Sequence, residues 1–156
     1  KPGRIDFDDL QHEQSYRKWK VYSDSKLANL LFAYELQRRL EAAGSPVISV
    51  AAHPGTSATN LVAVSAQDNI LKRLVMPAGA RLISQSAAKG ALPQLYAATA
   101  PDVKGGEYFG PNGIAESFGY PKRVDSTTAS KDLDAASRLW SISEELTQVT
   151  YAATLG

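Results

Sequence analysis

The stretch Tyr22–Phe32, YSDSKLANLLF, places a phenol and an ammonium group four residues apart at the start of an apolar helical pattern. On an α-helix, residues i and i+4 lie on one face, about 6 Å apart along the axis. A cation held beside a phenol stabilises its tyrosinate form, so the phenol can give up and regain a proton. Tyr22 is therefore a candidate proton donor and acceptor, and Lys26 is a candidate to assist it.

The same spacing occurs a second time, at Tyr16 and Lys20, so spacing alone is weak evidence for a site. This second pair lies in the basic stretch YRKWK, which contains no small residue. We interpret it as the solvated start of the helix. Tyr22 has Ser23 and Ser25 as neighbours, which leave room beside its side chain, and this context favours the pair that Tyr22 forms.

A long helix and a short strand follow in the sequence. Apolar residues at helical spacing predict a helix over residues 18–43, and Gly44 and Pro46 end it. Residues 47–52, VISVAA, are short, mostly apolar and followed by the sequence HPG at residues 53–55. This pattern predicts a buried strand of a parallel sheet. A helix, a short loop and a buried strand are the components of an α/β layer.

The remaining segments supply more helices than strands. Residues 1–16 are predicted to form a loop with one short extended piece, and residues 60–82 a mobile flap with one or two short helices. The pattern also predicts a helix over residues 84–100, with a kink or break at Pro93, and an amphipathic helix over residues 131–147. A strand is predicted over residues 106–110, and it leads into a turn. Three roles stay open for the flap, namely a substrate lid, a partner surface or a membrane-surface patch.

Two strands alone do not form a stable open sheet. A parallel strand that is buried on both faces needs neighbours at its edges, and the sequence offers none. We therefore predict an α/β fold in which the rest of the sheet lies outside this chain, in an upstream segment. The first residues, KPGR without a methionine, agree with a truncated or processed start.

The composition of the chain excludes several classes of function. With 44% apolar and 21% charged residues and a net charge of +1, the chain is ordinary globular protein and gives no reason to expect a nucleic-acid partner. It has no cysteine, which excludes disulfides, thiolate metal sites and cysteine nucleophiles, and its two histidines predict no metal site. No apolar run reaches the roughly 18 residues of a membrane span, and no signal-peptide core is present. We expect a soluble, cytoplasmic protein with a small-molecule ligand.

Four motifs taken together resemble the short-chain dehydrogenase/reductase family, and most closely its retinol-dehydrogenase-like branch. They are IDFDDL at residues 5–10, YSDSKLAN at 22–29 with the helix that follows, VISV at 47–50, and HPGTSATNL at 53–61. Each motif is weak alone, but the combination is specific and covers nearly the whole chain. The resemblance implies that residues 1–156 are the C-terminal portion of a single Rossmann-like domain, the C-terminal half of a doubly wound parallel sheet.

The resemblance implies catalytic roles for two residues. The family's catalytic tyrosine matches Tyr22, which would transfer the proton to or from the substrate oxygen. The family's lysine matches Lys26, which would support the tyrosine and bind the nicotinamide ribose. These roles agree with the physical interpretation of the pair.

The resemblance also implies cofactor contacts in the segment that follows the strand predicted at residues 47–52. The family's Pro-Gly turn matches Pro54 and Gly55, where backbone approaches the nicotinamide and glycine has the conformational freedom to allow it. The backbone of Ser57 would lie against the carboxamide. Thr59 would contact the cofactor, and it can be the N-cap of the next helix at the same time. His53 is expected to be a structural hydrogen-bonding residue rather than an acid or base.

Two features of the family are absent from this sequence. One is the Gly-rich turn that opens the first strand and helix and cradles the pyrophosphate, and the other is the catalytic serine, expected upstream of residue 1. The chain is therefore expected to carry half a site. In isolation it should neither bind dinucleotide well nor turn over substrate.

The function implied by the resemblance is NAD(P)-dependent oxidoreduction, in which an alcohol and a carbonyl compound are interconverted with NAD or NADP as cofactor. An epimerase or dehydratase of the extended branch also uses a Tyr and Lys pair and is the alternative among enzymes, although the HPG turn speaks against it. A non-catalytic fragment that acts as a binding module is the alternative from another class. The expected partners are a small-molecule substrate and the upstream half of the same protein, and a homo-oligomer stays open.

Overall fold

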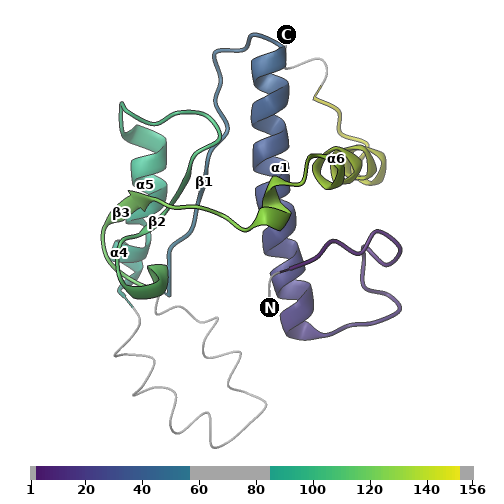
Figure 1. Ribbon diagram of the computed structural model, residues 1–156, viewed down its shortest axis with the longest axis horizontal. Helices are drawn as coiled ribbons and strands as arrows, with labels where there is room; N and C mark the ends of the chain where they lie inside the picture. Colours follow the sequence, from purple (N-terminus) through teal and green to yellow (C-terminus); the bar gives the residue numbers. More distant parts are fainter. Residues whose placement is uncertain (1–2, 57–84, 152–156) are drawn as a thin grey trace, which may run out of the picture. The chain divides into compact units, whose positions relative to one another are not determined.

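The computed structural model describes residues 3–56 and 85–151 of the 156-residue chain (Figure 1). The chain divides into two compact units. The helical unit comprises residues 1–50, 104–106 and 125–156, and the sheet unit comprises residues 51–103 and 107–124. The flap predicted at residues 60–82 lies outside the described residues, as do Ser57 and Thr59.

The longest element of the helical unit is α1, Lys18–Ala42, which confirms the helix predicted over residues 18–43. Its end is fixed by Gly44, whose backbone has φ +64°. Gly44 N donates to Glu41 O and Ser45 N donates to Leu40 O, both at 3.0 Å. This pair of bonds is a Schellman motif, in which a left-handed glycine satisfies the last carbonyl groups of a helix.

The core of the helical unit lies between α1 and α6, Leu133–Thr147, which lies across α1 (Figure 1). Leu27 and Leu31, one turn apart on α1, are buried against Ala136 and Leu139 of α6. The spacing of these apolar residues puts one stripe of each helix into the core. The predicted helix over 131–147 is confirmed, with its start two residues later because Asp132 is the N-cap and accepts a bond from Ala135 N at 2.9 Å.

The segment before α1 packs on this core but forms no strand within described residues 3–16. Ile5, Phe7 and Leu10 pack against the α1 and α6 cluster as partly buried side chains. Asp9 accepts bonds from the backbone N of Gln14 and of Ser15, at 3.2 and 3.1 Å, and so closes a turn. The segment is therefore a folded loop without a paired strand in its described part.

The sheet unit holds a three-stranded sheet in the order β1-β2-β3, so the chain is a mixed α/β protein. The strands are β1, Ala51–Ala52, β2, Tyr108–Pro111, and β3, Pro121–Arg123. β1 pairs in parallel with β2, as predicted for the segment that leads to residue 52, and β3 pairs antiparallel with β2. Phe109, at the centre of the sheet, is fully buried.

Two short helices, α4 and α5, lie beside the sheet in this unit. α4 spans Ala87–Gly90 and α5 spans Leu92–Thr99, and α5 contacts all three strands. The helix predicted over residues 84–100 is thus present with the break expected near Pro93, because proline is tolerated only in the first turn of a helix. Tyr96 of α5 packs on Phe109 with ring centroids 5.4 Å apart.

Two features of the predicted sheet are wrong. Only Ala51 and Ala52 of the six-residue strand predicted at 47–52 pair in the ladder, and Val47 and Ile48 are 60% and 47% exposed rather than buried. Among the described residues β1 has β2 as its single neighbour, and backbone bonding to the segment before β2 reaches Ser49, whose O accepts from Gly106 N at 2.8 Å. The third strand, β3, was not predicted because proline and two cations are typical of an edge strand and lack a buried apolar pattern.

The described part of the chain holds neither a membrane-spanning helix nor a metal-binding cluster. No helix among residues 3–56 and 85–151 is long and apolar enough to span a bilayer. The same residues contain no group of three or more His, Cys, Asp or Glu side chains placed to hold a metal ion.

Candidate active site

Tyr22 and Lys26 lie on one exposed face of α1, as their spacing predicts. Lys26 Nζ lies 5.3 Å from the centroid of the Tyr22 ring, a cation–π contact. Trp19, one turn earlier, meets Tyr22 edge to face with ring centroids 6.3 Å apart. Tyr22 is 41% exposed and Trp19 is 62% exposed. A phenol, an ammonium group and an indole thus share a surface that an incoming molecule can reach.

Two serines flank this phenol, and both turn their hydroxyl groups to the helix backbone. Ser25 Oγ donates to Tyr22 O at 2.8 Å, and Ser23 Oγ donates to Trp19 O at 2.9 Å. Because both side chains are short, they leave room beside the phenol ring. Each serine hydroxyl proton is already engaged with a helix carbonyl, so neither serine offers a free donor beside the phenol.

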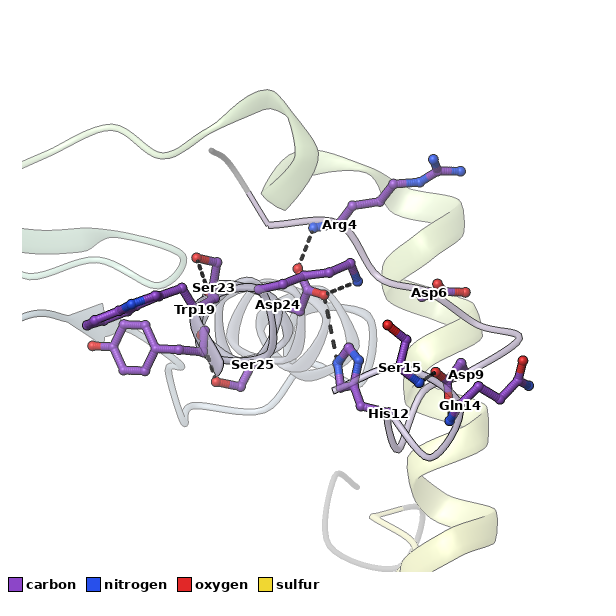
Figure 2. Close-up of polar contacts among 12 residues, drawn as sticks. Arg4, Asp6, Asp9, His12, Gln14, Ser15, Trp19, Ser23, Asp24 and Ser25 are labelled. Atoms are coloured by element: carbon purple, nitrogen blue, oxygen red, sulfur yellow. Dashed lines mark hydrogen bonds and ion pairs between the residues drawn. The ribbon is translucent and has the colours of Figure 1, made fainter. Parts of the chain in front are cut away.

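Asp24 lies on the opposite side of α1 and was not singled out from the sequence. Although it is ionisable, it is only 5% exposed. It accepts a bond from Arg4 N at 2.9 Å and from Lys20 Nζ at 2.7 Å, and His12 Nε2 lies 3.8 Å from its Oδ2 (Figure 2). The signal that could have found it is an aspartate inside an apolar helix, four residues after a lysine.

These contacts also account for the second Tyr and Lys pair. Tyr16 precedes the first residue of α1 and is 72% exposed, and Lys20 is bound to Asp24. The two residues therefore do not share a helical face. The interpretation of the pair as the solvated start of the helix fits the exposed Tyr16, whereas Lys20 is bound to a buried carboxylate.

In the sheet unit, the turn at residues 53–55 depends on glycine. Gly55 has φ +65°, and a Cβ atom there would lie 2.6 Å from Ser117 O and 2.8 Å from Glu116 O. Both the backbone conformation and the lack of space exclude larger residues. Thr56 N, directly after the turn, donates to Ser117 O at 2.7 Å, so the loop around Ser117 holds the turn closely.

His53 is a structural residue of this turn, as predicted. Its Nδ1 accepts a bond from Gly55 N at 3.2 Å, and its Nε2 lies 3.2 Å from Glu116 Oε2. An Nδ1 that accepts places the proton of the neutral ring on Nε2, which then donates to the carboxylate. Gly110 makes room for this ring, because a Cβ atom there would lie 2.1 Å from His53 Nε2.

Gln85 is the second support of the turn and was also missed from the sequence. It is 6% exposed, and its Nε2 donates to Pro54 O at 2.7 Å. Its Oε1 accepts from Gly119 N at 3.0 Å, and its backbone N donates to Thr56 O at 3.0 Å. One amide side chain therefore joins the turn to the loop that precedes β3. No local pattern in the sequence distinguishes this glutamine from a surface residue.

The structure groups the predicted site residues as follows. Tyr22 and Lys26 come together in the helical unit, and Pro54 and Gly55 form one turn in the sheet unit. Ser57 and Thr59 follow this turn in the sequence but lie outside the described residues, so their predicted cofactor contacts stay predictions.

Comparisons with known proteins identify relatives over nearly the whole chain, although no protein-family model matches. Human retinol dehydrogenase 14 is 41% identical over 150 residues, which cover 92% of this chain and 40% of that protein. Mouse polyprenol dehydrogenase is 34% identical over 147 residues, 93% of this chain and 40% of that protein. A crystal structure of an uncharacterized protein from Mycobacterium paratuberculosis is 39% identical, with a TM-score of 0.71 over 96% of this chain and 47% of that one.

The retinol dehydrogenases and the polyprenol dehydrogenase that the chain matches belong to the short-chain dehydrogenase/reductase family, in its retinol-dehydrogenase-like branch. The chain is homologous to them over about 92% of its own length. The chain spans about 40% of the length of the curated relatives it matches.

Proposed function

We propose that the complete protein is an NAD(P)-dependent oxidoreductase that interconverts an alcohol and a carbonyl compound. The observation that carries the proposal is the Tyr22 and Lys26 pair, with the ammonium group 5.3 Å from the ring centroid on an exposed helix face. The Tyr22 hydroxyl gives a proton to the substrate oxygen or takes one from it, and Lys26 stabilises the tyrosinate that remains. The relationship to retinol and polyprenol dehydrogenases supports this class of reaction.

The residues present fit NAD or NADP as the cofactor. Pro54 and Gly55 form a turn with no long side chain, so its backbone is the surface that a flat ring would meet. Lys26 offers three donors for ribose hydroxyl groups, and Ser57 and Thr59 complete the proposed contacts. When bound, the cofactor supplies or accepts the hydride, while the chain orients the reactants and moves the proton.

The rest of the site is proposed to come from the part of the protein outside this chain. The family resemblance assigns to that part the remaining strands of a Rossmann-like sheet, the Gly-rich turn and the catalytic serine. Residues 1–156 would then be the C-terminal portion of one domain. An experiment on function therefore uses the complete protein, since the isolated chain is expected to be inactive.

An apolar alcohol is the proposed substrate class. Retinol and polyprenol, after which the relatives are named, are both apolar alcohols. Trp19 supports the same class, because its exposed indole ring lies edge to face with Tyr22 and offers a flat apolar surface beside the phenol.

Replacing Tyr22 with Phe in the complete protein tests the proposal. We expect turnover of an apolar alcohol to fall by at least about 100-fold, because proton transfer by a placed side chain is worth that much. Titration of nicotinamide dinucleotide fluorescence should show cofactor binding changed by less than about threefold, since the hydroxyl group acts on the substrate.

Tyr16→Phe is the matched control, because Tyr16 has the same spacing to a lysine and is 72% exposed. This variant should keep its full turnover. Retained turnover in Tyr22→Phe would contradict the proton role of Tyr22, and with it the proposed function.

A further inference from the structure

The start of α1, which carries Tyr22, is poorly stabilised by its own sequence. The N-cap residue Arg17 makes no side-chain capping bond, and the first turn of Lys18–Ala42 contains no acidic residue. Lys18 and Lys20 instead place positive charge at the end of the helix where the dipole is already positive. The turns that carry the phenol therefore need support from elsewhere in the fold.

Asp24 provides that support from inside the unit. Its carboxylate is buried, neutralises Lys20 at 2.7 Å and accepts from Arg4 N at 2.9 Å, a bond between residues 20 apart in sequence. His12 Nε2 lies 3.8 Å away on the same loop. One side chain thus joins the loop before the helix to the second turn of the helix and offsets part of the unfavourable charge at its start.

The loop approaches the helix so closely that its position is well defined. A Cβ atom on Gly3 would lie 2.5 Å from Ser23 O, directly beside Asp24 in sequence. Arg4, the next residue, is the one whose backbone N–H reaches the carboxylate. A tight backbone contact and a charge-assisted hydrogen bond therefore fix the same point of α1.

Asp24 cannot touch a substrate that lies on Tyr22. Successive residues of an α-helix are about 100° apart, so Asp24, two residues from Tyr22 and two from Lys26, lies about 160° from each around the axis. Figure 2 looks along α1 and shows Trp19 on one side, whereas Asp24 points to the other side, towards Arg4 and His12. Any influence of Asp24 on Tyr22 passes through the helix backbone.

We infer that Asp24 is a positioning residue for the Tyr22 and Lys26 pair. By holding the first turns of α1 against residues 3–12, it sets the rotation of the helix segment that presents the phenol and the ammonium group. The inference rests on the proposed function, because it assigns Asp24 to the same proton-transfer site. The positioning role of Asp24 does not follow from the proposed function. A helix could present a Tyr and Lys pair without a buried carboxylate that binds the preceding loop.

Asp24→Asn in the complete protein separates positioning from mere stability. Asn keeps the size of the side chain and can still accept from Arg4 N, but it loses the charge that holds Lys20. We expect kcat to fall by about tenfold, within the roughly 100-fold that a small misplacement of a catalytic group can cost. The dissociation constant for the nicotinamide dinucleotide should change by less than about twofold. Rates are measured well below the melting temperature of the variant, where it is fully folded.

Two further variants keep the test decisive. Asp134→Asn removes the same charge from an exposed position on α6 and should leave kcat unchanged. Lys20→Met removes the partner, whose side chain is 43% exposed, and replaces Asp24→Asn as the test if that variant does not fold. We expect it to lower kcat about threefold, and hydrogen exchange of the amides at 18–26 to rise in step.

The outcomes distinguish this inference from the proposed function. Full kcat in a folded Asp24→Asn protein, or in Lys20→Met if that variant replaces it, overturns the positioning role. The proposed function is still tested separately by Tyr22→Phe. If Tyr22→Phe keeps its turnover, the proposed function fails and the positioning role fails with it. A loss of kcat in both Asp24→Asn and Tyr22→Phe, with dinucleotide affinity retained, supports both.

Discussion

The Tyr22–Lys26 segment and the His53–Gly55 turn reach their geometry by different routes. In α1 the helix itself sets the relation of Tyr22 to Lys26, because residues four apart share a face. In the turn, the backbone is held by groups from distant parts of the sequence, with Gln85 bound to Pro54 O across 31 residues and Glu116 near His53 across 63. The first geometry is local, and the second is assembled by the fold of the sheet unit.

The difference has a consequence for mutation. A substitution on the exposed face of α1 removes a function and leaves the helix intact, whereas a substitution in the turn disturbs the structure that holds it. Such a disturbance should appear as a loss in the free energy of unfolding, measured on the complete protein by chemical denaturation.

The largest cost is expected for Gly55→Val. Valine strains a backbone at φ +65°, and its Cβ atom would meet Ser117 O at 2.6 Å. Strain and overpacking together should lower the free energy of unfolding by about 3 kcal/mol. Dinucleotide affinity should fall as well, because the turn moves.

Gly44→Ala is the control for this prediction. Gly44 has nearly the same backbone, φ +64°, but nothing lies within 4 Å of its added Cβ atom. Only the conformational strain remains, about 1 kcal/mol. If both variants lowered the free energy of unfolding equally, the packing of Ser117 and Glu116 around Gly55 would not matter. The turn would then not depend on distant groups.

A smaller cost is expected for Gln85→Leu. Leucine fills a similar volume but leaves Pro54 O and Gly119 N without the partner that Gln85 gives them. A buried group that loses its hydrogen bond costs about 1–3 kcal/mol, and we expect about 2 kcal/mol for the pair because the loop can relax. Gln94→Leu, at an exposed position of α5, should change the free energy of unfolding by less than about 0.5 kcal/mol. A cost for Gln85→Leu as small as that of the control would contradict the role of Gln85 as a support of the turn.

The same contrast explains how much could be predicted from the sequence. The bounds of α1 follow from its apolar period and from Gly44, and the closeness of Tyr22 to Lys26 follows from their spacing on the helix, since all of these depend on neighbours within a few residues. The kink before α5 follows from Pro93 for the same reason.

What was missed depends on partners far along the chain. Asp24 gains its importance from Arg4, 20 residues away, and Gln85 from Pro54 and Gly119. β3 is a strand because β2 lies beside it, not because of its own residues. The strand predicted at 47–52 was too long because an apolar run predicts burial, whereas the number of paired residues is set by the neighbouring strand.

The smallest effect is expected from an exposed ion pair, and it depends on pH. In the sheet unit, hydrogen bonds from Arg123 and then from Tyr96 hold the pKa of Asp102 below its ordinary value of 3.8. A carboxyl group whose pKa is lower in the folded state stabilises the protein above about pH 4, and this stabilisation is lost as the pH falls through the folded value. Asp102→Asn should therefore flatten the fall in stability below about pH 4.

Asp125→Asn in the helical unit is the comparison for this variant. The pKa of Asp125 is also lowered, first by its hydrogen bond with Lys131 at 2.6 Å and then by the bond from Ser126 N. Denaturation at pH 3 and pH 7 should show a larger change in pH dependence for Asp102→Asn, and added salt should reduce both changes because both carboxylates are exposed. An equal or larger change for Asp125→Asn would mean that a single ion pair in the helical unit matches the network of the sheet unit, and that distant contacts add nothing at exposed sites.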